Sequence, residues 1–126
     1  MESGERIMKK IFIVLLSAFL LVGCESTTTE EIVYKTITQI DAEEKIKQED
    51  AVLIDVRTES EYEEGHIEGS INIPLDQIEN ISYDKDEIII VYCRSGGRSK
   101  TAAETLIANG YMNVYDFGAI GNWIVK

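Results

Sequence analysis

Cys93 has the surroundings that best suit a chemical reaction in this chain. It ends an apolar, β-branched run over 87–92 and opens a short turn that leads into good helix formers from Ser99 to Ala108. This order predicts a thiol at the carboxyl end of a strand, facing the N-terminus of a helix. Helix amides without backbone partners, together with the charges of Arg94 and Arg98, favour a thiolate. We therefore expect the pKa of this thiol to lie below its ordinary value of about 8.5. The alternative is a structural cysteine beside two surface arginines.

The turn after the cysteine also carries two adjacent glycines, Gly96 and Gly97. Glycine lets successive backbone amides point inward around an anion. The turn is therefore predicted to hold a small anion beside the thiolate.

The N-terminus carries the pattern of an export signal. Lys9 and Lys10 precede an apolar run over 11–22, which is shorter than the roughly 20 residues that span a bilayer. The run ends just before Cys24 and resembles a bacterial lipoprotein signal. We predict a signal peptide over 1–23, a lipidated Cys24 with a polar linker over 24–31, and a folded domain over 32–126. The alternatives are a transmembrane anchor or an ordinary export signal. Because acidic residues are rare at the start of a signal, Met8 is the expected translation start.

Cysteine count and charge bear on location and partners. If Cys24 carries lipid, Cys93 has no disulfide partner in an exported protein. The full chain has a net charge of −11, and removal of 1–23, whose net charge is +1, leaves −12. Such acidity disfavours nucleic acids and anionic lipid headgroups as partners, so attachment must come from acyl chains. The sequence thus predicts an extracytoplasmic monomer, lipid-anchored to the bacterial cell membrane.

Strand and helix patterns alternate along the predicted domain. Capping signals occur at Asp41 with Glu44 and at Thr58 with Glu61. Five strands that alternate with helices predict an α/β fold, an open sheet of mostly parallel strands with helices on both faces. Ligands of such sheets bind beyond the carboxyl ends of the strands, which is where Cys93 is expected. The expected strands cover 33–37, 52–56, 70–73, 87–92 and 114–117, and the expected helices cover 41–48, 58–65, 75–78 and 99–108.

Four motifs along the chain resemble the motifs of single-domain rhodaneses, in their order and spacing. The resemblance covers 37–123 and implies a rhodanese-like sheet, sulfurtransferase activity and a persulfide on Cys93. One departure is Phe117-Gly118-Ala119, where many relatives carry a Gly-Gly pair. The motifs are Asp55-Val56-Arg57, Glu61-Tyr62, the segment from Gly65 to Pro74, and the segment from Cys93 to Ser99.

The resemblance implies a mechanism in two steps. The Cys93 thiolate attacks the outer sulfur of thiosulfate or a related anion, sulfite leaves, and a thiol, a dithiol acceptor protein or cyanide then takes the sulfur. No cofactor and no metal are expected, because the chain has one histidine and no second free thiol. The residues expected to bind the substrate are Arg94, Ser95, Gly96, Gly97, Arg98 and Ser99.

Two other functions fit the same turn. One is a carrier without turnover, which holds persulfide for a membrane-associated partner. The other is a phosphatase or arsenate reductase, although those loops place five residues between cysteine and arginine, and only four separate Cys93 from Arg98. Outside the turn, we expect a structural ion pair between Arg57 and either Glu61 or a neighbouring acid. The alternative is that Asp55 and Arg57 both point at the active site. His66 is expected to fix the loop before the third strand rather than to act with the cysteine.

Overall fold

A computed structural model describes residues 31–125, so the predicted signal peptide, Met8 and Cys24 lie outside the described residues. The five strands are β1 (Lys35–Thr36), β2 (Val52–Asp55), β3 (Ile71–Asn72), β4 (Ile88–Cys93) and β5 (Asn113–Ala119). The helices are α2 (Gln39–Glu49), α3 (Glu59–Glu64) and α4 (Gly97–Ala108), with 3-10 turns η1 (Leu75–Asn80) and η2 (Ile120–Asn122). Within the described part, no helix is long and apolar enough to cross a membrane.

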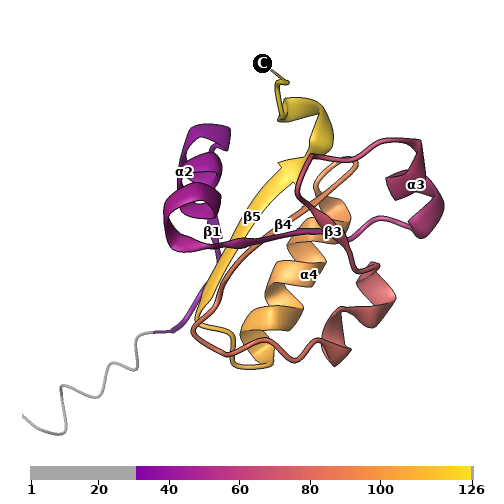
Figure 1. Cartoon of the computed structure of the whole chain (residues 1–126). Coiled ribbons are helices and arrows are strands. Elements are labelled where there is room, and N and C mark those ends of the chain that lie inside the picture. The colour runs from indigo at the N-terminus through magenta and orange to yellow at the C-terminus, as the bar shows by residue number, and fades with distance from the viewer. Residues whose placement is uncertain (1–30, 126) are drawn as a thin grey trace, which may run out of the picture. The chain divides into compact units, whose positions relative to one another are not determined.

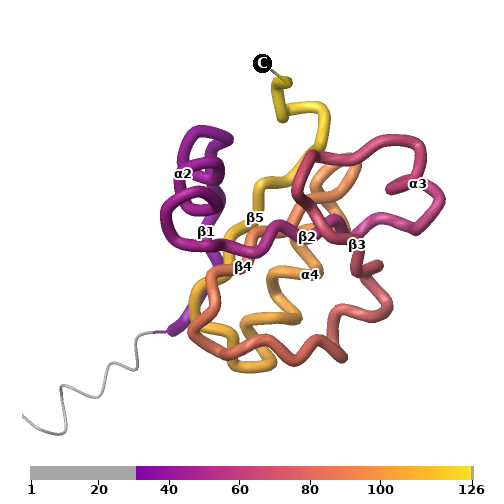
Figure 2. The backbone as a smooth tube through the Cα atoms, in the orientation of Figure 1, coloured from indigo at the N-terminus to yellow at the C-terminus, as the bar shows by residue number. Residues whose placement is uncertain are grey.

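All strand pairs of the sheet are parallel, in the order β1-β5-β4-β2-β3. Figure 2 traces β4 between β5 and β2, at the centre of the sheet. Helix α2 covers one face, while α4 covers the other face (Figure 1). The predicted open α/β sheet with helices on both faces is therefore confirmed.

The strand alternation of β4 explains how one short strand serves both faces. Its odd-numbered residues Ile89, Val91 and Cys93 pack in the cluster that contains α4, while Ile90 and Tyr92 pack in the cluster that contains α2. All five side chains are fully buried. Alternate strand residues point to opposite faces of a sheet, so Cys93 is directed toward α4.

The observed start of α2 corrects one expectation. The helix was expected to begin with a cap at Asp41, but the N-cap is Thr38, whose hydroxyl oxygen accepts a hydrogen bond from the Asp41 amide at 3.2 Å. Both residue types can cap a helix, and the extended backbone of Thr38 decides between them. At α3 the expected capping box of Thr58 and Glu61 is present.

Strand β5 contains an irregularity beside the end of β4. Val91 pairs with Asp116, yet Tyr92 pairs with Gly118, so Phe117 is an extra residue in the ladder. Gly118 has φ +88°, a conformation that side chains rarely adopt. The single glycine of Phe117-Gly118-Ala119 thus stands where the backbone requires one, and the pairing of Ala119 with Cys93 continues beyond it.

Candidate active site

The cysteine turn joins β4 to α4 through only three residues, 94–96. Cys93 is the last residue of β4, and α4 begins at Gly97, two residues before the expected start. Gly96, the N-cap of α4, has φ +98° and offers no side chain to cap the helix. Its amide instead donates to Cys93 Sγ at 3.0 Å. The sulfur therefore takes the place that a capping side chain fills in other helices.

The surroundings of Cys93 stabilise its anionic form. Burial raises the pKa of the thiol. Hydrogen bonds from the Ser99 hydroxyl and from the amides of Ser99, Gly96 and Ser95 lower this pKa, and together they outweigh the effect of burial. The net effect is a pKa below the ordinary thiol value, as the sequence predicted. The Ser99 hydroxyl also donates to the Gly96 carbonyl oxygen at 3.1 Å.

Arg98 lies in the first turn of α4 but is held by α3. Its two terminal nitrogens donate to the two carboxylate oxygens of Glu61, at 2.7 and 3.0 Å. The Arg98 guanidinium, with help from Thr58, lowers the pKa of Glu61 to about 2. The charge of Arg98 is thus largely neutralised, and the bidentate pair fixes α3 against the start of the cysteine turn's helix.

Arg57 pairs with Asp55 rather than with Glu61. The Arg57 Nε atom lies 3.0 Å from both Asp55 carboxylate oxygens, and one terminal nitrogen lies 2.7 Å from Oδ2. Both side chains are buried, and Arg57 also donates to the Gly65 carbonyl at 2.6 Å. Of the two expected partners, the neighbouring acid is correct. The pair ties the end of β2 to the loop before β3.

His66 contacts Tyr62, four residues earlier. The two rings stack at 3.7 Å between centroids, and Nδ1 donates to the Tyr62 carbonyl at 2.8 Å. The adjacent Ile67 amide donates to the Tyr92 hydroxyl at 3.1 Å. These contacts shape the loop before β3. Within residues 31–125, no group of three or more His, Cys, Asp or Glu side chains could hold a metal ion.

Two exposed cations, Arg94 and Lys100, lie close to Cys93 in the sequence. The side chains of Arg94 and Lys100 are exposed and make no hydrogen bond or ion pair within residues 31–125. Lys100 was not anticipated. One sequence feature could have indicated it: no acidic residue occurs between Glu87 and Glu104, although acidic residues are usually favoured in the first turn of a helix. Of the residues predicted to bind substrate, Ser95, Gly96 and Ser99 direct amides toward the sulfur, and Arg94 places an exposed cation beside them.

A parallel sheet whose central strand ends at a buried cysteine, with the sulfur at the N-terminus of the next helix, defines an α/β protein with a cysteine turn between strand and helix. The family model of the Rhodanese-like domain matches residues 38–124. Thiosulfate sulfurtransferase GlpE of Coxiella burnetii is 33% identical over 95 residues, which cover 73% of this chain and 89% of that protein. Protein YqhL of Bacillus subtilis is 34% identical over 116 residues, 90% of each chain.

Solved structures agree with this match. A rhodanese with anions from E. coli superposes with a TM-score of 0.56 at 32% identity, over 60% of this chain and 94% of that one. Human Single Domain Sulfurtransferase TSTD1 has the same fold, with a TM-score of 0.65 at 22% identity over 70% and 93% of the two chains. This chain belongs to the rhodanese-like domain family.

Proposed function

We propose that this protein is a sulfurtransferase that moves sulfane sulfur from thiosulfate, or a related anion, to a thiol or to cyanide. The observation that carries the proposal is the hydrogen bonding of Cys93 Sγ by the amides at the start of α4, which lowers the pKa of the thiol. The similarity to thiosulfate sulfurtransferase GlpE supports the choice of reaction.

The first step forms the persulfide. The Cys93 thiolate attacks the outer sulfur of thiosulfate, a sulfur–sulfur bond forms to Sγ, and the bond within thiosulfate breaks. Sulfite leaves with the electron pair, so no redox partner is needed. Amides of Ser95, Gly96 and Ser99 are directed toward the sulfur and stabilise the negative charge of the persulfide. No external general base is proposed, because the lowered pKa of the thiol favours its ionised form.

The second step returns the enzyme to its starting state. A thiolate or cyanide attacks the outer sulfur of the persulfide, and Cys93 leaves as a thiolate. Because Cys93 is fully buried beneath the turn, a small donor suits the site. The exposed cations Arg94 and Lys100 attract such an anion in a chain of strongly negative charge.

Intact mass after thiosulfate treatment tests the proposal. We expect a gain of one sulfur atom that cyanide removes, with release of many equivalents of sulfite per chain when cyanide is in excess. Persulfide formation without repeated release would indicate a carrier instead. Absence of the added sulfur would overturn both functions.

We further propose that Cys24 is acylated and anchors the protein outside the cytoplasm. The support is the sequence alone: the basic and apolar segment that ends at this cysteine. Detergent-phase partitioning and lipid labelling of the wild type and of Cys24→Ala test it. An aqueous wild-type protein without lipid on its N-terminus would refute the anchor.

A further inference from the structure

A groove lies beside the C-terminal segment, at the edge of the sheet where β4 and β5 end. It has a volume of about 600 Å³ and is formed by the segments 66–68 and 120–125 together with Glu43 of α2. Ile120 directly follows Ala119, which pairs with Cys93, and Ile67 is hydrogen-bonded to Tyr92. Both walls are therefore attached to residues that adjoin the cysteine turn. The groove opens on the α2 side of the edge, whereas Cys93 is directed toward α4.

The C-terminal wall of the groove is held in place by specific contacts. The Gln39 side chain donates to the Ile124 carbonyl at 2.8 Å and accepts from the Ile124 amide at 2.7 Å. Trp123 packs edge-on against Phe117, with ring centroids 5.2 Å apart. Because these contacts are already made, a partner would meet a surface that needs little ordering.

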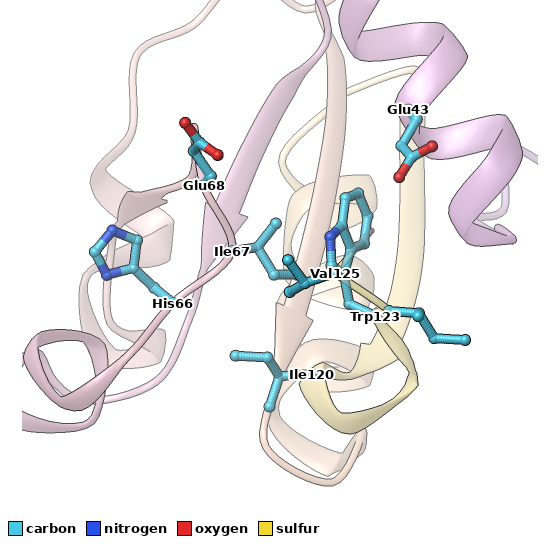
Figure 3. Close-up of a pocket in the computed structure, with 8 residues that line it drawn as sticks. Glu43, His66, Ile67, Glu68, Ile120, Trp123 and Val125 are labelled. Atoms are coloured by element: carbon cyan, nitrogen blue, oxygen red, sulfur yellow. The ribbon is translucent and has the colours of Figure 1, made fainter.

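The groove combines apolar walls with acidic rims. Figure 3 shows Glu68 and Glu43 on opposite sides of Ile67, Val125 and Trp123. Ile124 and Val125 are 70% and 89% exposed. Such a surface is too large and too apolar for thiosulfate, and its carboxylates repel an anion. A cation flanked by apolar groups is its complement.

Charge separates this groove from the cysteine turn. Residues 32–125 carry eight lysines and arginines against eighteen aspartates and glutamates, a net charge of −10. Arg94, Arg98 and Lys100 lie at the turn, and none of the lysines and arginines within residues 31–125 lines the groove. The small anionic donor and the occupant of the groove must therefore differ in chemistry.

We propose that the groove docks the sulfur acceptor, a protein segment in which lysine or arginine flanks a large apolar side chain near a thiol. The proposal rests on the proposed sulfurtransferase function. Once docked, the acceptor thiol loses its proton to solvent and the thiolate attacks the outer sulfur of the Cys93 persulfide. A sulfur–sulfur bond to the acceptor forms, the bond to Sγ breaks, and Cys93 leaves as a thiolate.

Trp123, the only tryptophan of the chain, provides a direct measurement of binding. The full chain is titrated with short synthetic peptides that contain S-alkylated cysteine, phenylalanine and either lysines or glutamates, and Trp123 emission is followed. The alkylated peptides cannot accept sulfur, so this experiment is independent of the sulfurtransferase reaction. We expect the lysine peptide to bind at least about tenfold more tightly than the glutamate peptide, with the difference reduced by salt.

Charge reversal at the rim sharpens the test. Glu68→Lys should weaken binding of the lysine peptide by about tenfold, and Ile124→Ser should weaken both peptides. Glu104→Lys on α4 makes the same change of charge at an exposed position outside the groove and serves as the control. With unalkylated peptides, the rate of sulfur uptake from the persulfide, divided by the rate for dithiothreitol, should follow the same order.

Three results would overturn the proposal. They are equal binding of the two peptides, equal effects of Glu68→Lys and Glu104→Lys, or a wild-type dimer in sedimentation that Ile124→Ser dissociates, since a second copy would then occupy the groove. If dithiothreitol takes no sulfur from the protein but the lysine peptide still binds more tightly than the glutamate peptide, the sulfurtransferase function is wrong. The binding preference of the groove is then still supported.

Discussion

The N-termini of α3 and α4 solve the same physical problem in opposite ways. Both helices begin with amides that lack intrahelical partners. At α3, the Thr58 hydroxyl accepts from the Glu61 amide at 3.3 Å, and Glu59 and Glu61 add negative charge. At α4, the N-cap is a glycine and no acid lies in the first turn. The sulfur of Cys93 takes the place of the missing cap.

The difference shows which terminus is built for structure and which for chemistry. A capped, acidic N-terminus has no capacity left for an incoming anion. The α4 terminus keeps its donors for the Cys93 sulfur, which changes between thiolate and persulfide in the proposed reaction. It also carries basic residues where they are locally unfavourable by about 0.3–1 kcal/mol each. Glu61 connects the two sites, because it caps α3 and also binds Arg98.

The largest expected effect comes from removal of the sulfur itself. Cys93→Ser leaves α4 with a neutral hydroxyl that does not ionise near neutral pH, so sulfite release from thiosulfate should fall by at least about a thousandfold. The thermal midpoint should change little, since the side chains are similar in size. Substantial remaining turnover in a steady-state sulfite assay would show that the nucleophile lies elsewhere.

The next effect separates the two glycines of the turn. Gly96→Ala forces a side chain into φ +98°, which should cost about 1–2 kcal/mol of the free energy of unfolding and move the amide that donates to Sγ. Sulfur transfer should fall by about tenfold or more.

Gly97→Ala is the matched control for that change. A Cβ at Gly97 meets nothing within 4 Å, and its φ lies outside the left-handed region. We expect the free energy of unfolding of this variant to stay within about 0.5 kcal/mol of the wild type. Denaturant titrations and sulfite assays of the two variants should therefore differ clearly, and equal losses would show that φ at Gly96 does not position the sulfur.

A smaller effect distinguishes hydrogen bonds from charge at α4. Ser99→Ala removes the hydroxyl that contributes most to lowering the pKa of Cys93, so that pKa should rise. Arg98→Ala should also raise it, but by less, because Glu61 already neutralises much of the guanidinium charge. Sulfur transfer at neutral pH should fall about three- to tenfold in Arg98→Ala and further in Ser99→Ala.

The measurement is the pH profile of Cys93 alkylation by a neutral reagent. A double variant, Arg98→Ala with Glu61→Gln, removes both members of the ion pair and should return the profile toward the wild type. If Arg98→Ala shifts the profile more than Ser99→Ala does, charge rather than hydrogen bonding governs the thiolate.

Local signals predicted the fold and the cysteine turn because they lie within a few residues of one another. The apolar run before Cys93, the glycine pair and the helix formers after Ser99 together specify strand, turn and helix. The start of α2 was predicted wrongly because Thr38 and Asp41 are both competent caps, and only the backbone conformation selects one.

Contacts across the chain could not be predicted in the same way. Arg98 and Glu61 are 37 residues apart, and the capping role of Glu61 already accounted for its presence. Arg57 was also an expected ion-pair partner of Glu61, but the structure pairs Arg57 with Asp55. The groove beside the C-terminus draws on three separate segments, so no spacing within one of them indicates it.

The smallest expected effect concerns the α3 terminus and its acid. Arg98 holds the pKa of Glu61 at about 2, below its ordinary value of 4.5. A carboxylate whose pKa is lower in the folded state stabilises the fold above its unfolded pKa, and this stabilisation is lost as the pH falls from about 4.5 to about 2. Because the pair is partly exposed, Glu61→Gln should reduce the free energy of unfolding at neutral pH by no more than about 1 kcal/mol. The variant should also lose less stability than the wild type between these two pH values.

Denaturant titrations across this range provide the measurement. The control is Glu104→Gln, because Glu104 is an exposed acid of α4 without a partner within residues 31–125. If the free energy of unfolding depends on pH in the same way for wild type and Glu61→Gln, then Arg98 does not lower the pKa of Glu61. The N-termini of α3 and α4 would then act independently.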